Sequence, residues 1–434
     1  MKIERSIEFR GKEYAFLSDD SREAQSDEAV LFVETSRNVL FAEQMRKEGR
    51  DILHYRDLKE YFTFPAQIIG ITGTNGKTTT ANLIYHVLLK NGKKCAMLGT
   101  QGLFFGGKQI KPKGLTTPGI LELYEDLALL HELGCEVLVM EVSSHAISQD
   151  RIFGLDFAAK ILTNITSDHL DYHKTLASYI ATKNAFLSDG GLKIINKDEE
   201  NANFSPKNTK SYGVKNPCDL QAKNFDKNHA TLQYQGREYM LKMPLYGLHN
   251  LYNIMACVLC VRELFGLEME QILSSLQDFG GVSGRMEVVC QNPMVIVDFA
   301  HTHDGIEKIL QGFLGQSLSV VFGAGGDRDR SKRPLMGEVV RKYAKKIYVT
   351  SDNPRSEDPM SIIRDILEGI EDREGVVVLP DRYEAIKKAL DHQEPGEILF
   401  VLGKGDETHQ ILVDRVVDFD DRMVIRELLS CRLV

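Results

Sequence analysis

A glycine-rich stretch followed by a lysine and threonines carries the clearest chemical signal in the sequence. The apolar run Ile68-Ile69-Gly70-Ile71 leads into Gly73-Thr74-Asn75-Gly76-Lys77-Thr78-Thr79. Glycines let backbone N–H groups wrap a polyphosphate, a lysine reaches the outer phosphates, and a threonine hydroxyl can hold Mg²⁺. The strict motif has a glycine six residues before the lysine, where this chain has Ile71. Because a strand pattern precedes the stretch and a helix pattern follows it, we interpret it as a nucleoside triphosphate site.

Further polar residues follow predicted strands in the first half of the chain. Glu141 comes directly after the apolar run 137–140. A carboxylate opposite a phosphate loop is where phosphate-bound Mg²⁺ needs an oxygen ligand, so Glu141 is a candidate metal ligand. His169 and His173 follow another apolar run and could share a helix face and bind zinc, but no third ligand has suitable spacing. By itself, His169 is as readily a turn residue as a ligand.

The second half of the chain shows the same arrangement at three predicted strand ends. Asp298 ends a strand, a position from which an acid commonly takes ribose hydroxyls. Gly325-Gly326-Asp327-Arg328 follows the next strand, and Asp352-Asn353-Pro354-Arg355 follows the one after. An arginine fork held in a turn by proline suits a carboxylate, whereas a solvated arginine in a surface turn is an equal alternative. Asn253, in a helix pattern, could read an adenine edge or cap a helix.

Composition limits the class of protein. A chain of 434 residues is too long for one core and predicts two or three domains. Its formal charge of −9 and lack of a basic block argue against a nucleic-acid-binding surface. The first residues are charged and no run of about 20 apolar residues occurs, so we expect neither a signal peptide nor a membrane span. Seven scattered cysteines fit a cytoplasmic protein, and Cys257 and Cys260 lie in a helix pattern that predicts core residues rather than a zinc site.

The elements that must position these residues alternate between strand and helix, which predicts α/β domains with mostly parallel sheets. We expect three domains: a small N-terminal α/β domain at 1–65, a central mononucleotide-binding sheet with the phosphate loop at 66–283, and a Rossmann-like domain at 284–434. Residues 219–243 look like a β insertion. The expected strands are 29–33, 67–71, 94–98, 137–140, 160–162, 193–195, 294–297, 318–322, 346–350, 376–379 and 398–402. The expected helices are 78–89, 120–133, 178–187, 250–265, 303–313, 334–343, 360–369 and 383–390.

These motifs, in this order, resemble the Mur ligase family, the ATP-dependent amino-acid ligases of peptidoglycan precursor synthesis, over nearly the whole chain. Besides the phosphate loop, the similar segments are Glu141-Val142-Ser143-Ser144-His145, Asp168-His169-Leu170-Asp171-Tyr172-His173, His249-Asn250 with Asn253, Gly284-Arg285-Met286-Glu287 and Asp298-Phe299-Ala300-His301-Thr302. Within the family, the chain is most similar to the type that adds the third peptide residue to UDP-N-acetylmuramoyl-L-alanyl-D-glutamate. Asp352-Asn353-Pro354-Arg355 resembles the motif of the meso-2,6-diaminopimelate-adding type. The resemblance implies an ADP-forming ligase of cell wall biogenesis that uses ATP and Mg²⁺ and forms an acyl phosphate; we expect a monomer.

The resemblance also assigns roles by matched position. It implies phosphate and ATP contacts from Gly73, Thr74, Asn75, Gly76, Lys77, Thr78, Thr79, Asn253, Arg285 and Asp298. The implied catalytic residues are Lys77, Glu141, His169 and Lys183, and the implied Mg²⁺ ligands are Thr78, Glu141, His169 and Lys183, the last as a carbamate. The UDP-linked substrate would contact Ser21, Thr116, Thr117, Ser143, Gln149 and Arg151. Diaminopimelate would contact Arg328, Asp352, Asn353, Pro354, Arg355, Gly403 and Glu407.

The chain departs from the family pattern at several positions. Phe299 stands where tyrosine is usual, His303 where proline is usual, Ser331 where glycine is usual, and Asp406 where histidine is frequent. The first domain is short and the loop after Val33 does not follow the family, so Ser21 is the only uridine contact expected there.

Three alternatives remain at this stage. An L-lysine-adding enzyme of the same type would lack a partner for a distal carboxylate. A folylpolyglutamate synthetase-like ligase shares the phosphate loop and layout but takes no uridine substrate. A nucleotide-switch protein with slow ATPase activity would form no amide, and the dense polar strand ends argue against it.

Overall fold

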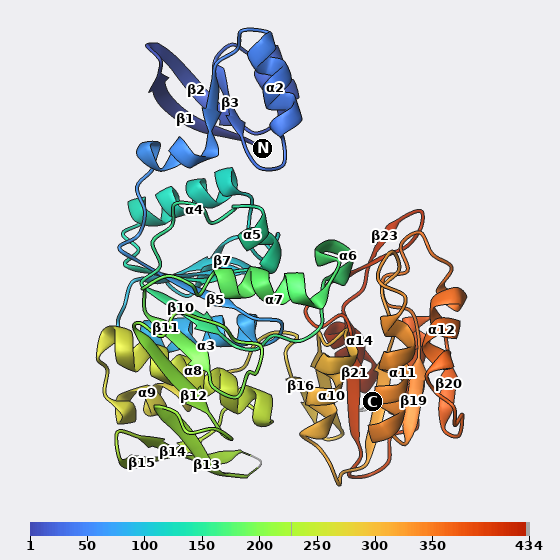
Figure 1. Cartoon of the computed structure of the whole chain (residues 1–434). Helices are drawn as coiled ribbons and strands as arrows, with labels where there is room; N and C mark the ends of the chain where they lie inside the picture. The colour runs from blue at the N-terminus through green and yellow to red at the C-terminus, as the bar shows by residue number, and fades with distance from the viewer. Residues whose placement is uncertain (227, 431–434) are drawn as a thin grey trace.

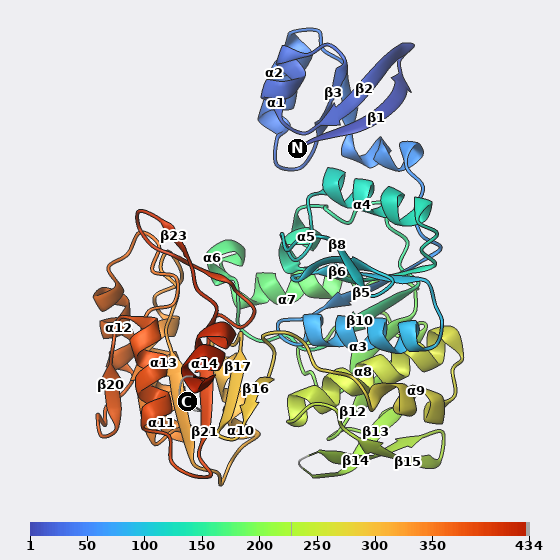
Figure 2. The ribbon, with the colours of Figure 1, turned by 180° about the vertical axis from the view of Figure 1, so that it is seen from behind.

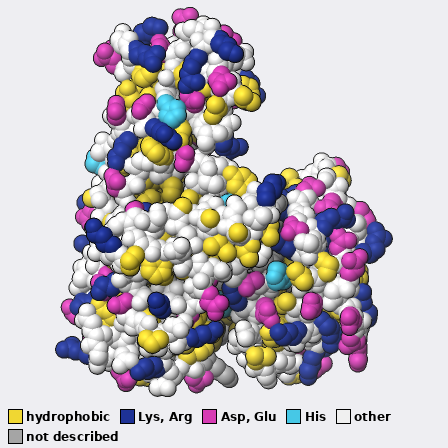
Figure 3. Space-filling view, in the orientation of Figure 1, with side chains coloured by type: hydrophobic (Ala, Val, Ile, Leu, Met, Phe, Trp, Pro, Cys, Tyr) yellow, Lys and Arg dark blue, Asp and Glu magenta, His cyan; other side chains and the backbone are white. Residues whose placement is uncertain are grey.

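The computed structural model describes residues 1–226 and 228–430, and three sheets divide this part of the chain. A four-stranded, an eleven-stranded and a six-stranded sheet follow one another in sequence, and a two-stranded ribbon is added near the end. The three sheets fall within the ranges 1–65, 66–283 and 284–434. Figure 1 shows the N-terminal unit above the central unit and the C-terminal unit beside the central one. The N-terminal unit projects from the rest, which gives the molecule an L-shaped outline in the space-filling view (Figure 3).

The N-terminal unit begins with a hairpin that the sequence analysis did not predict. Strands β1 and β2 turn at Arg10 and Gly11, whose φ angles of 52° and 75° fit a two-residue hairpin turn. Ile3 and Ile7 are buried between charged neighbours, and this mixed composition hid the strand. Strand β3 pairs with β2 in parallel, and β4 pairs with β3 in parallel. The elements are β1 (Lys2–Phe9), β2 (Lys12–Ser18), α1 (Ser21–Ser26), β3 (Val30–Glu34), α2 (Val39–Lys47), β4 (Ile52–His54) and the 3₁₀ helix η1 (Tyr55–Tyr61).

The central unit places the phosphate-loop strand β5 in the middle of its sheet. The strand order is β15-β14-β13-β12-β11-β10-β5-β9-β6-β7-β8, and the strands from β6 to β13 in this order run parallel. The neighbours of β5 are therefore β10 and β9, whose carboxyl ends lie beside the phosphate loop. The predicted β insertion at 219–243 forms strands β13, β14 and β15, an antiparallel meander that extends this same sheet.

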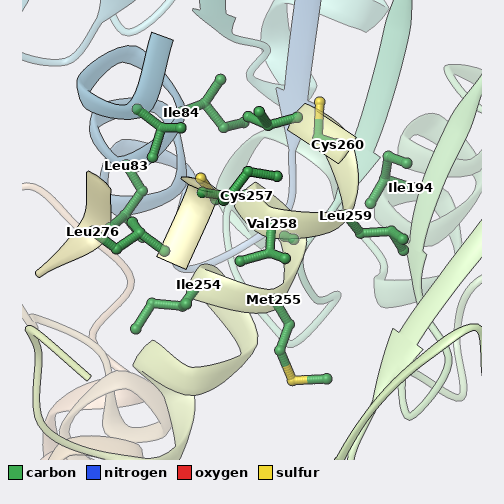
Figure 4. Close-up of a cluster of buried hydrophobic side chains, with 14 of the residues drawn as sticks. Leu83, Ile84, Ile194, Ile254, Met255, Cys257, Val258, Leu259, Cys260 and Leu276 are labelled. Carbon is green, nitrogen blue, oxygen red and sulfur yellow. The ribbon is translucent and has the colours of Figure 1, made fainter. Parts of the chain in front are cut away.

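Apolar helices cover both faces of the central sheet, which confirms the predicted layering. Helices α3, α8 and α9 share one core, where Cys257 and Cys260 are buried side chains of α8 (Figure 4). Helices α4 and α7 cover the other face. The elements are β5 (Gln67–Thr72), α3 (Lys77–Lys90), β6 (Cys95–Gly99), β7 (Gly102–Phe105), β8 (Lys108–Lys111), α4 (Ile120–Glu132), β9 (Val137–Glu141), α5 (Ser144–Ser148), β10 (Ala159–Leu162), α6 (Leu170–His173), α7 (Leu176–Ala185), β11 (Lys193–Asn196), β12 (Thr209–Gly213), β13 (Leu220–Asp226), β14 (His229–Tyr234), β15 (Arg237–Lys242), α8 (Leu248–Phe265) and α9 (Met269–Leu276).

The C-terminal unit is the predicted second α/β sheet, with the strand order β16-β17-β21-β18-β19-β20. Only β16 is antiparallel to its neighbour among these described strands. Helices α10, α11 and α12 cover one face, and α13 and α14 cover the other, as Figures 1 and 2 show from opposite sides. The elements are β16 (Glu287–Gln291), β17 (Met294–Asp298), α10 (His303–Gln311), β18 (Leu318–Phe322), α11 (Lys332–Tyr343), β19 (Lys346–Val349), α12 (Pro359–Glu368), β20 (Val376–Val378), α13 (Arg382–Asp391), β21 (Ile398–Leu402), β22 (His409–Ile411), β23 (Val416–Asp418) and α14 (Asp421–Ser430).

The predicted strands and helices are confirmed, with bounds that differ by a few residues at most. None of the helices in the described part of the chain has the length and apolarity required to cross a bilayer.

Candidate active site

The phosphate loop connects β5 to α3 in a conformation that only glycine fits at two positions. Gly73 has a φ of 151° and Gly76 a φ of 85°. A Cβ atom at Gly73 would lie 1.8 Å from Thr163 Oγ1, and one at Gly76 would lie 2.3 Å from Asn253 Oδ1. The backbone therefore approaches its neighbours too closely for any side chain. Because α3 begins at Lys77, its free N–H groups and positive end face the loop, as a polyphosphate site requires.

Asn164, just after β10, holds the loop in place. Its carbonyl oxygen accepts a bond of 2.8 Å from the Thr74 amide, and its Oδ1 accepts one of 3.0 Å from the Asn75 amide. This residue was not selected from the sequence. Its position directly after a parallel strand that pairs with β5 was the available signal.

Two lysine amines donate to the same backbone oxygen of the phosphate loop. Lys77 Nζ donates to the carbonyl oxygens of Gly73, at 2.8 Å, and Thr74, at 2.9 Å. Lys183 Nζ, from α7, donates to the same Gly73 oxygen at 2.9 Å. The Lys183 side chain is fully buried, and burial, together with the charge of Lys77, lowers its pKa well below the ordinary value. Sequence alone gave no reason to select Lys183, which only the family resemblance identified.

Glu141 faces the first turn of α3, as expected for a metal-binding carboxylate. The pairing of Ile71 with Glu141 in adjacent parallel strands brings the carboxylate beside the loop. Thr78 Oγ1 donates to Glu141 at 3.1 Å, and the backbone amide and hydroxyl of Thr100 donate to it at 2.9 and 3.2 Å. Thr100, at the end of β6, was missed, although its place after a parallel strand resembles that of Glu141.

The donor set fits Mg²⁺ better than zinc. Thr78 and Glu141 offer neighbouring oxygens, and Mg²⁺ commonly takes few protein ligands and completes its shell with phosphate and water. His169 lines the same cleft, and burial lowers its pKa to about 4, which leaves a neutral ring able to act as a ligand. His173, the second histidine of the predicted zinc pair, lies at the other end of α6, where its Nε2 is 2.9 Å from Ser144 Oγ. Residues 1–226 and 228–430 hold no cluster of three or more His, Cys, Asp or Glu side chains that could bind a metal ion.

A cleft of about 610 Å³ opens between the central and C-terminal units around this site. Arg285 and Asp298 line it from the C-terminal side, and the guanidinium of Arg285 stacks 4.2 Å from the Phe299 ring centroid. Both oxygens of Asp298 accept backbone N–H groups, from Met286 and from Ala300, so this carboxylate also holds the loops that carry Arg285. The predicted residues that line the cleft are Thr74, Asn75, Gly76, Lys77, Thr78, Thr79, Thr116, Glu141, His169, Asn253, Arg285, Asp298 and Arg328.

Contacts across this cleft join the two units. Asp304, in the first turn of α10, accepts hydrogen bonds from Asn75 Nδ2 at 3.1 Å and from Thr166 Oγ1 at 2.8 Å. Lys332 Nζ, at the start of α11, lies 3.0 Å from Asp168 Oδ1. The phosphate loop and the segment after β10 are therefore bonded to the C-terminal unit, through Asp304 and Lys332. The sequence analysis did not select these two residues, because their partners are far away in sequence.

A second hollow of about 550 Å³ lies between the N-terminal unit and the central unit. Three predicted UDP-substrate residues line it: Ser21, Gln149 and Arg151. The loop after Val33 lines the hollow as well, with Thr35, Arg37, Asn38 and Phe41.

The remaining predicted UDP-substrate residues connect this pocket to the cleft. Arg151 Nη1 donates to the Thr117 carbonyl oxygen at 2.8 Å, and Thr117 Oγ1 donates to the Glu141 carbonyl oxygen at 2.9 Å. The Ser143 amide donates to Thr117 Oγ1 at 3.0 Å, while Thr116 lies in the cleft with its hydroxyl 3.2 Å from that of Thr100. The set therefore forms a continuous track rather than one pocket.

The predicted diaminopimelate residues gather at the carboxyl ends of β18, β19 and β21. Asn353 Nδ2 donates to Glu407 Oε2 at 2.8 Å, and a Cβ atom at Gly403 would lie 2.6 Å from the Asp352 carboxylate. Pro354 lies against Gly326, where a Cβ atom would come within 1.9 Å of the proline carbonyl oxygen. The two loops therefore pack backbone to backbone.

Two arginines of these loops lie near each other, beside Gly325. Arg355 is half-buried and donates from Nη1 to the Gly326 carbonyl oxygen at 2.7 Å. Burial and the neighbouring charge of Arg328 both lower the pKa of Arg355, since two cations near each other disfavour charge. Arg355 is therefore not a solvated surface residue, and the pair suits an anionic group.

Comparison with known proteins agrees with this geometry. Residues 71–261 match the Mur ligase middle domain, and residues 284–405 match the Mur ligase glutamate ligase domain. The chain belongs to the Mur ligase family, whose members are ATP-dependent, ADP-forming ligases. The predicted family, fold class and enzyme class are thereby confirmed.

Individual relatives narrow the type of ligase that the chain is similar to. It is 48% identical over 439 residues to the UDP-N-acetylmuramoyl-L-alanyl-D-glutamate--2,6-diaminopimelate ligase of Helicobacter pylori, covering 98% of each chain. It is 49% identical to the protein of the same name from Wolinella succinogenes, covering 96% of this chain and 97% of the relative. A solved structure with that name superimposes with a TM-score of 0.66 at 27% identity, covering 99% of this chain and 98% of the other. The folylpolyglutamate synthase of Mycobacterium tuberculosis shares the fold at 17% identity and a TM-score of 0.64, covering 80% and 90% of the two chains.

Proposed function

We propose that this protein joins meso-2,6-diaminopimelate to UDP-N-acetylmuramoyl-L-alanyl-D-glutamate with conversion of ATP to ADP and phosphate, in peptidoglycan precursor synthesis. The observation that carries the proposal is the identity of 48% over nearly the full length with a relative that bears this name. Its support in the structure is a phosphate loop and a carboxylate-hydroxyl pair that share a cleft with arginines of the C-terminal unit. Free thiols at all six described cysteines and nucleotide-linked substrates fit a cytoplasmic enzyme.

The reaction requires activation because a carboxylate is a poor electrophile. An oxygen of the D-glutamate carboxylate attacks the γ-phosphorus of ATP, the bond to ADP breaks, and an acyl phosphate forms. The neutral amine of the second substrate then attacks the acyl carbon, phosphate leaves with the electron pair of the broken C–O bond, and the nitrogen releases one proton to solvent as the amide forms. The protein contributes positioning and charge neutralisation, which we assign to the N-terminus of α3, Lys77 and Thr79.

Mg²⁺ would neutralise phosphate charge when bound, and the residues that would hold it are Thr78, Glu141 and His169. Asn253, Arg285 and Asp298, on opposite sides of the cleft, would hold the adenosine part of ATP. The UDP end of the peptide substrate would occupy the N-terminal pocket, and its peptide would follow the track from Arg151 through Thr117 toward Glu141. This arrangement would bring the D-glutamate carboxylate to the phosphate loop.

The alternatives fit less well. Curated relatives named for diaminopimelate addition are 44–49% identical over nearly the whole chain, and Arg355 would repel the bare ammonium of L-lysine. The folylpolyglutamate synthases share only the fold at 17% identity. A nucleotide switch needs no residues for a second and third substrate, whereas this chain forms a separate pocket beside the N-terminal unit.

Phosphate release tests the proposed function. With ATP, Mg²⁺, UDP-N-acetylmuramoyl-L-alanyl-D-glutamate and meso-diaminopimelate, we expect sustained release of phosphate together with a new amide product detected by mass spectrometry. Omission of any one substrate should stop turnover, and replacement of diaminopimelate by L-lysine should reduce kcat/KM by about 100-fold or more. Equal use of the two amino acids would refute the assignment, and steady release without the UDP substrate would favour a nucleotide switch.

We also propose that Lys183 carries a carbamate. An amine must be neutral to react with CO₂, and the burial of Lys183 favours the neutral form. The product is an anion beside Gly73 and Lys77, where it could bind a second Mg²⁺ and would offset the charge of Lys77. Without the modification, the amines of Lys77 and Lys183 both donate to the Gly73 carbonyl oxygen.

Replacement of Lys183 by alanine should lower kcat by about 100-fold or more, and millimolar acetate or formate should restore part of the activity by replacing the carboxylate. Carbon-13 NMR of the protein in labelled bicarbonate should show one carbamate signal that the variant lacks. Lys193, a buried lysine at the start of β11 that bonds only backbone carbonyl oxygens of its own turn, supplies the control Lys193→Met. A labelled signal that persists in Lys183→Ala would place the carbamate elsewhere.

A further inference from the structure

A single buried arginine joins the two loops that carry Arg328 and Arg355. Arg333 lies in the first turn of α11, and its side chain is 2% exposed. It does not line the cleft, and no predicted substrate-binding role falls on it. Its contacts, however, reach the loop after β18, the loop after β19 and helix α12.

The contacts of Arg333 form a fork. Nη2 lies 2.7 Å from Glu357 Oε1 and Nη1 lies 2.9 Å from Glu357 Oε2, which is a bidentate ion pair. Nη1 also donates to Asp365 Oδ2 at 2.8 Å, and Nη2 donates to the Gly325 carbonyl oxygen at 3.2 Å. Hydrogen bonding from Arg333 lowers the pKa of Glu357 to about 2, so the pair is ionised near neutral pH.

The carboxylate of Glu357 connects Arg333 to both loops. Glu357 Oε1 also accepts the Asp327 amide at 2.6 Å, and Asp327 directly precedes Arg328 in sequence. Glu357 itself lies two residues after Arg355. The carboxylate therefore binds the segment that precedes Arg328, while Glu357 itself belongs to the segment that carries Arg355. Arg333 binds both oxygens of this carboxylate and so connects the two segments.

The orientation of the Arg355 side chain depends on how the loop after β18 packs against the loop after β19. Arg355 has a φ of 52°, an uncommon conformation for a residue with a side chain, which surrounding contacts must maintain. Its Nη1 donates to Gly326 O, and the Gly326 amide donates to the Asn353 carbonyl oxygen at 2.9 Å. A shift of one loop would therefore move the guanidinium as well.

We propose that Arg333, through its bidentate ion pair with Glu357, is a positioning residue that sets the selectivity for an amino acid with a distal carboxylate. It does so by holding Arg355 and Arg328 in the arrangement that receives this carboxylate. The inference rests on the proposed function, since it concerns recognition of the same amino acid. Arginine is required because its planar fork satisfies both oxygens of Glu357 and still reaches Asp365, which a lysine ammonium cannot do.

Arg330 offers a matched control because it approaches the same two carboxylates from the solvent side. Its Nη2 lies 3.7 Å from Glu357 Oε2 and its Nε lies 3.2 Å from Asp365 Oδ2, but its side chain is 61% exposed. An exposed pair of this kind contributes little. Arg330→Met thus removes a positive charge near the same acids without removing the fork.

The test compares Arg333→Lys, Arg333→Met, Glu357→Gln and Arg330→Met with the native protein. The measurements are KM and kcat for diaminopimelate, KM for ATP and for the UDP substrate, the ratio of kcat/KM for diaminopimelate to that for L-lysine, and the melting temperature. In Arg333→Lys and Glu357→Gln we expect KM for diaminopimelate to rise by about tenfold to 100-fold and the selectivity ratio to fall, because small misplacements of a positioning group have large effects. KM for ATP and for the UDP substrate should stay within about twofold of native, and Arg330→Met should behave as native.

The outcomes separate the inference from the proposed function. A native protein that does not use diaminopimelate would contradict the proposed function before any variant is made. A selective native protein whose ratio is unchanged in both Arg333→Lys and Glu357→Gln would overturn the inference alone. A lower melting temperature with equal increases in all three KM values would show a purely structural role and would also overturn it. If Arg333→Met does not fold, the two milder substitutions decide the question.

Discussion

Replacement of Lys77 by alanine is expected to lower amide formation by about a thousandfold or more. Lys77 is the first residue of α3, and its Nζ donates to the Gly73 and Thr74 carbonyl oxygens of the phosphate loop. In the presence of ATP, a lysine in such a loop moves to the outer phosphates, where it opposes the charge that builds up during phosphoryl transfer. Because that charge is largest in the transition state, kcat should fall more than KM for ATP rises.

The matched control for this variant lies on the same helix. Lys90, at the far end of α3, is an exposed lysine paired with Asp278, and Lys90→Ala should retain native kcat. Initial rates of phosphate release and amide formation, with circular dichroism to verify folding, complete the measurement. Amide formation by Lys77→Ala at the native rate would show that the phosphate loop does not take part in the reaction.

Replacement of Arg355 by alanine should raise KM for diaminopimelate by about 100-fold, which corresponds to about 2.7 kcal/mol. Arg355 is half-buried and lies near Arg328, and burial together with the charge of Arg328 lowers the pKa of Arg355, so a carboxylate bound between them would relieve the repulsion between the two cations. L-lysine lacks the distal carboxylate, so the low kcat/KM for L-lysine should stay the same or rise. The ratio of kcat/KM for the two amino acids should therefore fall steeply.

Arg364→Ala provides the control for Arg355. Arg364 is an exposed arginine on the neighbouring helix α12, with a side chain 67% exposed and an ion pair with Asp358. It should leave both amino-acid KM values unchanged. Isothermal titration of an ATP analogue should give the same affinity for the native protein, Arg355→Ala and Arg364→Ala. A loss of ATP affinity in Arg355→Ala equal to the loss for diaminopimelate would assign this arginine to the nucleotide or to the structure of the domain.

Local patterns predicted the elements of the fold well because each pattern has a direct physical origin. Parallel strands buried on both faces are apolar throughout, as at Ile68–Ile71 in β5, and the helices between them repeat their apolar residues with the helical period. The hairpin of β1 and β2 was missed because single buried isoleucines stand among charged residues. The meander of β13 to β15 was recognised as β structure, but only the strand pairing showed that it continues the central sheet.

The sequence by itself determined the family, the phosphate loop and the chemical type of the site, because these depend on residue types at short and fixed spacing. Gly73, Gly76 and Lys77 are adjacent in the chain, and Glu141 follows a strand whose end had to meet the loop in a parallel sheet. The tertiary structure decided which side chains complete the site: Thr100 on Glu141, Asp304 on Asn75, Lys332 on Asp168 and Arg333 on Glu357. Two of these pairs, Asp304 with Asn75 and Lys332 with Asp168, join different domains, and all four form between segments that come together only through topology and packing. No periodicity or spacing within the chain encodes a contact of that kind, so the geometry that links the phosphate loop to the amino-acid loops had to be observed in three dimensions.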